Sequence, residues 1–195
     1  MMRPPGGDPG RIVFLNGVSS SGKSSIARHL LEALEQPWFH MPVDAFGAML
    51  RPERPTDPSS GPELAEVLTR MRAGFHRAVA GMAAAGNNIV VDHVLSEPWR
   101  LVDCLRVFNG LDVVFVGVHC SIEELHRREL ARRDRAPGQA AAQIAQVHAH
   151  GCYDLTCDTT TTGPEDCARM IVQFLAHRPP GPTAFDRLRA AGDTR

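Results

Sequence analysis

The sequence predicts an α/β fold, a three-layer α/β/α sandwich around a five-stranded, mainly parallel sheet. Two observations support this class. Short apolar runs typical of buried strands alternate along the chain with longer segments whose apolar residues recur at helical spacing, and no internal repeat interrupts the alternation. At 195 residues, with 43% hydrophobic and 22% charged residues, the chain is also long enough for one domain with a substantial core.

The first half of the chain is expected to supply three strands and two long helices. The strand candidates are 11–16 (RIVFLN), 38–43 (WFHMPV) and 88–94 (NIVVDHV), all short and largely apolar. A helix is expected from Ser24 to about Leu34. A second begins near Pro62 and Glu63 and continues to about Ala85, where Gly86 and Asn87 stop it. The Pro- and Ser-rich stretch 51–62 is expected to be a loop.

The second half is expected to add the remaining strands, 112–120 (DVVFVGVHC) and 153–158, and the helices 96–108, 121–133, about 139–148 and 164–176. The helix at 121–133 begins with a Ser-x-x-Glu capping box, Ser121 and Glu124. The predicted domain therefore spans residues 11–176. Residues 1–10, rich in Pro and Gly, are expected to form a flexible lead, and residues 177–195 a partly ordered tail.

Composition excludes several classes of protein. A net charge of −1 argues against broad binding to nucleic acid or to a membrane surface, and no apolar run approaches the roughly 20 residues that span a bilayer. The N-terminus lacks the apolar segment of a secretory signal, and the five cysteines form no CxxC pair. These features predict a cytoplasmic protein with unpaired cysteines. They leave the oligomeric state open, a homo-oligomer included.

Residues 17–24, GVSSSGKS, match the pattern G-x-x-x-x-G-K-[ST] in full, after a predicted strand and at the start of a predicted helix. In such a P-loop the glycines allow a tight turn, so that backbone N–H groups point at phosphate oxygens. Lys23 is the only lysine among 21 Lys and Arg residues, and a compact, mobile ammonium suits the β- and γ-phosphates better than a planar guanidinium does. The predicted nucleotide site comprises Gly17, Ser19, Ser20, Ser21, Gly22, Lys23, Ser24 and Ser25.

Two aspartates follow predicted strands, at the edge where parallel sheets bind ligands. Asp44 is expected to accept a proton from an acceptor hydroxyl; because it precedes AFGAML, the alternative is a helix N-cap. Ser24 is expected to offer its hydroxyl to Mg²⁺, and Asp92 to hold the same ion through water. The alternatives for Asp92 are a hydrogen bond to Ser24 or the role of the base itself. A GTPase is excluded in its usual form, because the N-K-x-D guanine motif needs a second lysine.

Further candidates lie in the segment ELARRDR (129–135) and beside the two aspartates. Arg132, Arg133 and Arg135 are expected to belong to a lid near residues 127–138 that stacks on adenine and clamps phosphates. Arg133 is expected to act in catalysis, although a solvated helix face would also explain arginines here. Phe46 and His93 are expected to line the acceptor pocket; core packing and a structural role are their alternatives.

Several segments resemble the chloramphenicol phosphotransferase family in order and spacing. They are IVFLNGVSSSGKSS (12–25), PW (37–38), VDAF (43–46), IVVD (89–92), LDVVFVGVHC (111–120), RELARRDR (128–135) and YDLTCDTT (153–160). The resemblance covers roughly residues 11–176. It implies a fold like that of small nucleotide and metabolite kinases, and transfer of the γ-phosphoryl group of ATP to the primary hydroxyl of chloramphenicol.

By position, the resemblance implies that Asp44 is the base and that Lys23 and Ser24 are the P-loop pair. It also places Arg132, Arg133 and Arg135 in the lid segment. The chain departs from the family where an acceptor would bind. The family has a pair of acids after the third strand, where this chain has Asp92 and His93, and the segment 45–62 is its own.

The sequence therefore predicts an ATP- and Mg²⁺-dependent O-phosphotransferase that acts on a small hydroxylated molecule, with chloramphenicol or a related antibiotic as the first candidate. A second hypothesis keeps the chemistry and changes the acceptor to a nucleoside, a sugar acid or, as in zeta-toxin-like kinases, a sugar nucleotide. A third is a nucleotide-binding regulatory protein. Asp44 and Asp92 argue against the third, because they follow strands where a kinase needs carboxylates.

Overall fold

The strands of the protein form one parallel sheet. A computed structural model describes residues 7–50, 60–131 and 139–192. Within these residues the sheet has the order β2-β3-β1-β4-β5, and each neighbouring pair is parallel. The strands are β1 (Ile12–Asn16), β2 (Trp38–Pro42), β3 (Asn88–His93), β4 (Val113–His119) and β5 (Leu155–Asp158). The predicted five-stranded sheet is confirmed.

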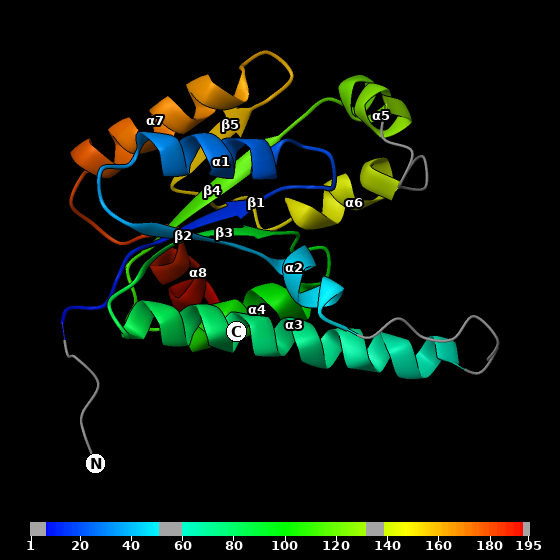
Figure 1. Ribbon diagram of the computed structural model, residues 1–195, viewed down its shortest axis with the longest axis horizontal. Coiled ribbons are helices and arrows are strands. Elements are labelled where there is room, and N and C mark those ends of the chain that lie inside the picture. The colour runs from blue at the N-terminus through cyan, green and yellow to red at the C-terminus, as the bar shows by residue number, and fades with distance from the viewer. Residues whose placement is uncertain (1–6, 51–59, 132–138, 193–195) are drawn as a thin grey trace.

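Helices cover both faces of this sheet, as the three-layer prediction requires (Figure 1). On one face lie α1 (Lys23–Ala33) and α7 (Pro164–His177), and on the other α3 (Ser60–Ala84), α4 (Pro98–Val107) and α8 (Ala184–Gly192). The short α2 (Val43–Ala48) follows β2, and α5 (Ile122–Ala131) and α6 (Gln139–Val147) lie beyond the carboxyl ends of the strands. None of the described helices has the length and apolar character needed to cross a bilayer.

The central strand β1 is apolar throughout because both of its faces are covered. Ile12 and Phe14 point to the layer of α3, α4 and α8, whereas Val13 and Leu15 point to the layer of α1 and α7. All four side chains are fully buried. Phe14 contacts Phe115 of β4 edge-on, with ring centroids 5.6 Å apart. A strand buried on both faces loses the polar–apolar alternation of a half-exposed strand, which explains the continuous apolar run.

The structure corrects the sequence-based expectation at both ends of the domain. Residues 177–195 were expected to form a partly ordered tail, but they contain α8, in which Ala184 and Phe185 are fully buried. The Phe185 ring lies edge-on to Phe115 at 5.0 Å. Gly10, expected in the flexible lead, is buried and donates a backbone hydrogen bond to the Ala83 carbonyl at 2.8 Å. The packed domain therefore extends beyond the predicted range on both sides.

Helix α5 begins with half of the predicted capping box. The Ser121 hydroxyl accepts a hydrogen bond from the Glu124 N–H at 3.2 Å. The Glu124 carboxylate does not return to Ser121; it pairs with Arg127 and Arg128. The Ser121 N–H donates instead to the Thr160 hydroxyl at 2.8 Å, which ties the start of α5 to the chain after β5.

Candidate active site

The P-loop lies between β1 and α1, at the carboxyl edge of the sheet. Its first glycine contacts β4 closely, since a Cβ atom at Gly17 would lie 2.4 Å from the Val118 carbonyl oxygen. Gly22 has a φ of +97°, and Ser20 also adopts a left-handed conformation with a φ of +62°. The Ser20 hydroxyl is buried and has no hydrogen-bond partner among the described residues. These features give a tightly turned backbone of the kind that binds phosphate oxygens.

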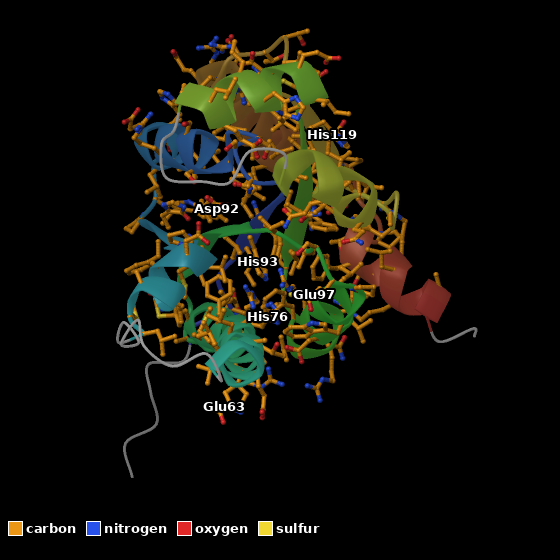
Figure 2. The ribbon with its side chains drawn as sticks, turned by 90° about the vertical axis from the view of Figure 1, so that its right-hand side faces the viewer. Glu63, His76, Asp92, His93, Glu97 and His119 are labelled. Atoms are coloured by element: carbon orange, nitrogen blue, oxygen red, sulfur yellow. The ribbon has the colours of Figure 1, made fainter. Side chains whose placement is uncertain are left out.

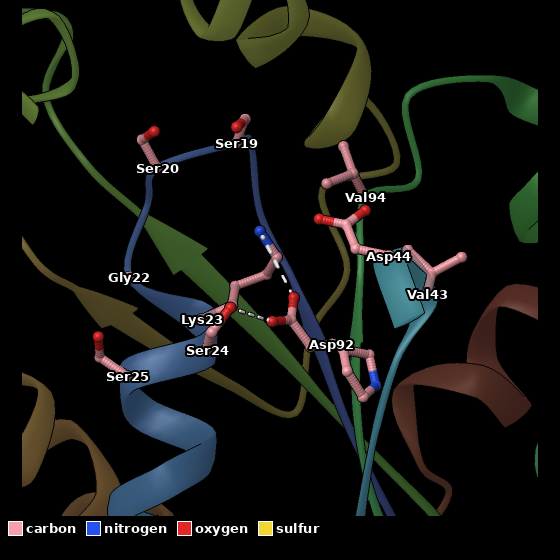
Figure 3. A pocket seen from close by; sticks show the side chains of 11 residues that line it. Ser19, Ser20, Gly22, Lys23, Ser24, Ser25, Val43, Asp44, Asp92 and Val94 are labelled. Atoms are coloured by element: carbon pink, nitrogen blue, oxygen red, sulfur yellow. Dashed lines mark hydrogen bonds and ion pairs between the residues drawn. The ribbon is translucent and has the colours of Figure 1, made fainter. Parts of the chain in front are cut away.

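Lys23, Ser24 and Asp92 meet beside this loop (Figure 3). Lys23 is only 6% exposed; its Nζ donates to the Val18 carbonyl at 2.9 Å and lies 3.7 Å from Asp92 Oδ1. The Ser24 hydroxyl donates to Asp92 Oδ2 at 2.5 Å. The hydrogen bond between Asp92 and Ser24, one of the alternatives left open by the sequence, is therefore present. The carboxylate also compensates the buried ammonium charge.

The Ser24 hydroxyl and the Asp92 carboxylate fit a magnesium ion. Both are hard oxygen donors, and they line the same pocket of about 130 Å³ as the P-loop serines. Magnesium in nucleotide sites is commonly held by one or two protein oxygens together with phosphate oxygens and water. This pair of side chains supplies the protein share of such a set.

Asp44 lies across the pocket from the P-loop, in the first turn of α2 (Figure 3). The N-cap of α2 is Pro42 and no side chain caps the helix, so the N-cap alternative for Asp44 is wrong. Asp44 is exposed and lines both the P-loop pocket and a second pocket beside it. A carboxylate at this junction can receive a proton from a hydroxyl held in the second pocket.

The second pocket has a volume of about 380 Å³, within the usual range for small-molecule sites of roughly 300–1,000 Å³. It adjoins the first through Ser19 and Asp44, and side chains of α3, β3 and α4 line its remainder, among them Arg72, His93 and Arg100. The structure thus brings His93 to the wall where an acceptor pocket was predicted. Phe46 does not line either pocket; its ring packs edge-on against Phe75 of α3 at 5.0 Å.

A chain of hydrogen bonds reaches His93 from outside the pocket. Figure 2 labels two of its members, His76 and His93. His76 Nδ1 lies 2.8 Å from Asp103 Oδ2, and His76 Nε2 lies 3.2 Å from His93 Nε2. Burial alone would raise the pKa of Asp103, but hydrogen bonds from Arg77, His76 and Arg106 outweigh it and hold that pKa well below its ordinary value. Asp103 is therefore an ionised acceptor, and His76 carries its proton on Nδ1.

This chain fixes the tautomer of His93. Burial lowers the pKa of His76. Burial, with the charges of Arg100, Arg72 and Lys23, also holds the pKa of His93 well below 6.5, so both rings are neutral near pH 7. His76 Nε2 then lacks a proton and accepts one hydrogen bond, from His93 Nε2–H. His93 Nδ1, which is buried without a partner among the described residues, consequently presents a lone pair.

The lid predicted near residues 127–138 lies only partly in the described chain. Arg132, Arg133 and Arg135 lie outside the described residues. Arg128, which sequence reasoning did not single out, donates to the Thr159 carbonyl at 2.8 Å and to the Ser20 carbonyl at 3.3 Å. These contacts hold one wall of a third pocket of about 230 Å³ on the outer side of the P-loop, lined by Ser20, Gly22, Ser25, Arg127, Arg128 and Thr159.

The residues missed by sequence reasoning carry weak local signals. Arg128 follows Glu124 at the i, i+4 spacing of a helical ion pair, which gives it a fixed position above Thr159. Arg72 and Arg100 lie on two different helices, 28 residues apart in the sequence, and no motif marks either of them. Only the packing of α3 against α4 brings them to one pocket.

Comparisons with known proteins show the family of this chain. The model of the family described as "Chloramphenicol phosphotransferase-like protein" matches residues 10–176. A Mycobacterium tuberculosis protein (strain ATCC 25618 / H37Rv) named "Putative O-phosphotransferase" is 34% identical over 199 residues, covering 92% of this chain and 88% of its own.

Two solved structures show the same fold. One is the Mycobacterium tuberculosis APS kinase in complex with AMPPNP and APS, with a TM-score of 0.63, 17% identity, and coverage of 88% of this chain and 100% of that chain. The other is a sugar kinase from Janibacter sp. HTCC2649, with a TM-score of 0.62, 21% identity, and coverage of 88% and 97%. The chain therefore belongs to the chloramphenicol phosphotransferase-like family and is a phosphotransferase of the P-loop kinase type.

Proposed function

We propose that the protein transfers the γ-phosphoryl group of ATP to a hydroxyl of a small molecule. One observation carries the proposal: Asp44 lines both the P-loop pocket and the pocket beside it, so a carboxylate lies where a phosphoryl donor and an acceptor would meet. A hydrolase would need no second pocket of about 380 Å³ next to its phosphate cradle. A regulatory protein that only binds nucleotide would need no base at that junction.

Each side chain then has a defined role. Asp44 orients the acceptor hydroxyl and takes its proton as the oxygen attacks the γ-phosphorus, while the bond from the γ-phosphorus to the bridging oxygen of the β-phosphate breaks and ADP leaves. Lys23 and the P-loop N–H groups stabilise the charge on the phosphoryl oxygens. Ser24 and Asp92 would hold the magnesium ion, which neutralises phosphate charge when bound. The predicted lid arginines Arg132, Arg133 and Arg135 would complete the cation set around the transferring group.

The third pocket supports a place for the nucleoside. It adjoins the P-loop through Ser20, Gly22 and Ser25, and its far walls come from α5 and from Thr159 and Pro164 after β5. The Arg127 and Arg128 guanidinium groups border it, and such planar groups stack well on a purine ring. We therefore place adenosine here, with its phosphates running across the P-loop toward Asp44.

Chloramphenicol or a related antibiotic is the acceptor that membership of the family suggests first. A second class of acceptor, the small anionic molecules that include sugar acids and sugar nucleotides, is favoured by Arg72 and Arg100 in the acceptor pocket. Both classes fit the same reaction, so the choice between them is a question of substrate and not of mechanism.

Substitution of Asp44 by asparagine tests the reaction. The amide keeps the size of the side chain and removes the base, so acceptor-dependent ADP release should fall by about 10²- to 10⁴-fold while ATP binding changes little. The assay uses ATP, Mg²⁺ and a panel of chloramphenicol, nucleosides, sugar acids and sugar nucleotides. Binding of a non-hydrolysable ATP analogue is measured by calorimetry.

Asp166→Asn is the matched control, since Asp166 is likewise an exposed aspartate in the first turn of a helix, α7, and lines none of the three pockets described above. It should leave both measurements unchanged. Near-normal turnover by Asp44→Asn would remove Asp44 from the mechanism. No stimulation of ADP release by any acceptor in the panel would contradict the kinase proposal itself.

A further inference from the structure

The acceptor pocket has an uneven distribution of charge. Asp44 stands at its junction with the P-loop pocket, whereas the two arginines Arg72 and Arg100 come from α3 and α4. His93 lines the same pocket. The pocket thus has a carboxylate at the phosphoryl-donor side and two permanent cations in its remaining wall.

Arg100 is held rigidly in that wall. It is only 6% exposed, and its Nη1 donates at 2.9 Å to both the Val94 carbonyl and the Ser96 hydroxyl. Its Nη2 donates to Glu97. Its Nε has no partner among the described residues, although the atom is buried. An unpaired buried N–H of a cation costs free energy unless a ligand supplies the missing acceptor.

Arg72 adds a second positive charge to the same wall. Among the residues that the structure describes, it forms no ion pair, in contrast to Arg70 and Arg77 on the same helix. Arg72 is also close enough to Arg100 to lower the pKa of that guanidinium, an effect second only to burial. Two like charges in a half-buried pocket repel each other. The Glu97 carboxylate, which pairs with Arg100 and is also attracted by Arg72, offsets part of this repulsion, and an anion bound between the two arginines would offset more of it.

We propose that the acceptor of this enzyme carries an anionic group, a carboxylate, phosphate or sulfate, which binds to Arg72 and Arg100 while its hydroxyl points at Asp44. Guanidinium groups match the planar, bidentate geometry of such oxyanions. A neutral acceptor such as chloramphenicol would leave the Arg72 charge and the Arg100 Nε–H unpaired when it displaced water from the pocket. This inference rests on the proposed phosphotransferase function and narrows its substrate class.

The opposite placement of the charges also sets the direction of binding. An anionic group near Asp44 would be repelled by that carboxylate and by the phosphates of ATP, whereas the wall formed by Arg72 and Arg100 attracts it. The acceptor therefore enters with its charge away from the P-loop. This orientation keeps the anionic group of the acceptor at a distance from the phosphoryl group that is transferred.

Sulfate is a probe that tests the site without knowledge of the acceptor. The protein is saturated with Mg²⁺ and a non-hydrolysable ATP analogue, so that the P-loop is filled, and sulfate is titrated by calorimetry at constant ionic strength. Arg72→Met should weaken sulfate binding at least tenfold. The matched control is Arg70→Met, because Arg70 lies on the same helix but is 63% exposed and paired with Glu66. It should bind sulfate like the unaltered protein.

The titration decides the inference whether or not an acceptor is known. A saturable sulfate site that Arg72→Met loses and Arg70→Met keeps supports it. Equal titrations for the unaltered protein and Arg72→Met overturn it. The proposed function is tested separately, by the ADP-release assay. Absence of acceptor-dependent ADP release would contradict that function and not the anion site.

Acceptor pairs give a second, independent test. Hydroxy acids and sugar phosphates are compared with the corresponding neutral amides and sugars, and kcat/KM should be at least tenfold higher for the charged member. Arg72→Met should remove that preference by raising KM for the acid, with KM for ATP unchanged. The inference is overturned if neutral acceptors are turned over as fast as the acids and if Arg72→Met changes neither rate.

Discussion

The phosphate pocket and the acceptor pocket share a wall but are built in different ways. More than half of the residues that line the phosphate pocket come from one continuous stretch of chain, Ser19 to Ser25, with a tightly turned backbone and one ammonium. The acceptor pocket is assembled from side chains of α2, α3, β3, α4 and α6. Its cations are arginines anchored on separate helices.

This difference shows what each pocket can change. A substitution in the P-loop alters a backbone that every nucleotide-dependent step uses, so it affects the reaction as a whole. A substitution in α3 or α4 exchanges one side chain of the acceptor pocket and leaves the phosphate pocket intact. Substrate choice can therefore vary within a family that keeps its reaction, as the departures of residues 45–62 and His93 from the family pattern suggest.

After the loss expected for Asp44→Asn, the next largest effect is expected at Lys23. Replacement by methionine removes the ammonium that donates to Val18 and lies beside Asp92, and kcat should fall by about 10²- to 10³-fold with every acceptor. Lys23→Arg should recover little of the activity, because a rigid planar group does not fit the space of a side chain that is 6% exposed. Steady-state kinetics with ATP and the best acceptor measure both variants.

Thermal unfolding serves as the check on folding for the two Lys23 variants. If either unfolds at a much lower temperature, its activity says nothing of phosphate stabilisation and single-turnover rates at low temperature are compared instead. Full activity of Lys23→Arg in a stable protein would show that the P-loop tolerates a guanidinium, and the contrast between the two pockets would weaken.

A middle-sized effect, confined to the acceptor side, is expected at Asp103. Asparagine at this position can donate as well as accept, so His76 and His93 lose their fixed tautomers. KM for the acceptor should rise about tenfold, the usual consequence of one disrupted buried hydrogen bond, while kcat and KM for ATP stay within about twofold. Asp103 acts through two histidines and is thus a positioning residue.

Arg106→Gln is the control for this prediction, because Arg106 also contacts Asp103, at 2.8 Å, but is 69% exposed and leaves the histidine chain untouched. It should change neither Michaelis constant. Equal rises in KM for Asp103→Asn and Arg106→Gln would mean that the Asp103 charge stabilises α4 and does not orient His93.

The smallest effect concerns stability on the phosphate side. Asn16, the last residue of β1 before the P-loop, donates to the Tyr153 hydroxyl at 2.8 Å, and that hydroxyl lies 2.7 Å from His148 Nδ1. Burial, aided by the nearby His119, His150 and Lys23, lowers the pKa of His148 to about 4. The neutral ring therefore contributes stability above pH ~6.5, and this contribution is lost as the pH falls from there toward 4, where the unfolded chain binds a proton that the folded chain does not.

His148→Gln removes this titration. The free energy of unfolding should then decline less between pH 7 and pH 5 than in the unaltered protein, as measured by urea denaturation at several pH values. Part of the decline in the free energy of unfolding should remain, because other histidines, among them His119 and His150, also have lowered pKa values. An identical decline in both proteins would place the pKa of folded His148 near that of the free side chain.

The two pockets also differ in how far the sequence could predict them. The P-loop is contiguous and its glycines permit one tight backbone turn, so its position in the fold follows from the order of the amino acids alone. The hydrogen bond between Ser24 and Asp92 was one of the alternatives that the sequence left open. The approximate bounds of β1, β3 and β4 followed from apolar patterns, because these three strands are buried almost throughout. Asp44 was expected on the ligand edge for the same reason, since it follows a parallel strand.

The acceptor pocket was beyond such reasoning because it depends on the rotation of helices against one another. Phe46 was expected to face the acceptor, but α2 turns that ring onto Phe75 and presents Gly47 to the pocket instead. Arg72 and His76 lie one helical turn apart on α3, and their residue types are common on any long helix. Their place in the site depends on α4, which supplies Arg100 to the pocket and Asp103 to His76.

Helix α8 has a consequence for how the protein is made. Phe185 completes a cluster of rings with Phe14, Phe108 and Phe115, yet it lies beyond the stretch that the family model matches. During synthesis the five strands emerge first, and the part of one apolar face that α3 and α4 leave to α8 stays uncovered until residues 184–192 leave the ribosome. A nascent chain halted near residue 176 would contain every residue proposed for catalysis and would still expose hydrophobic surface. Such a chain is a target for chaperones and proteases.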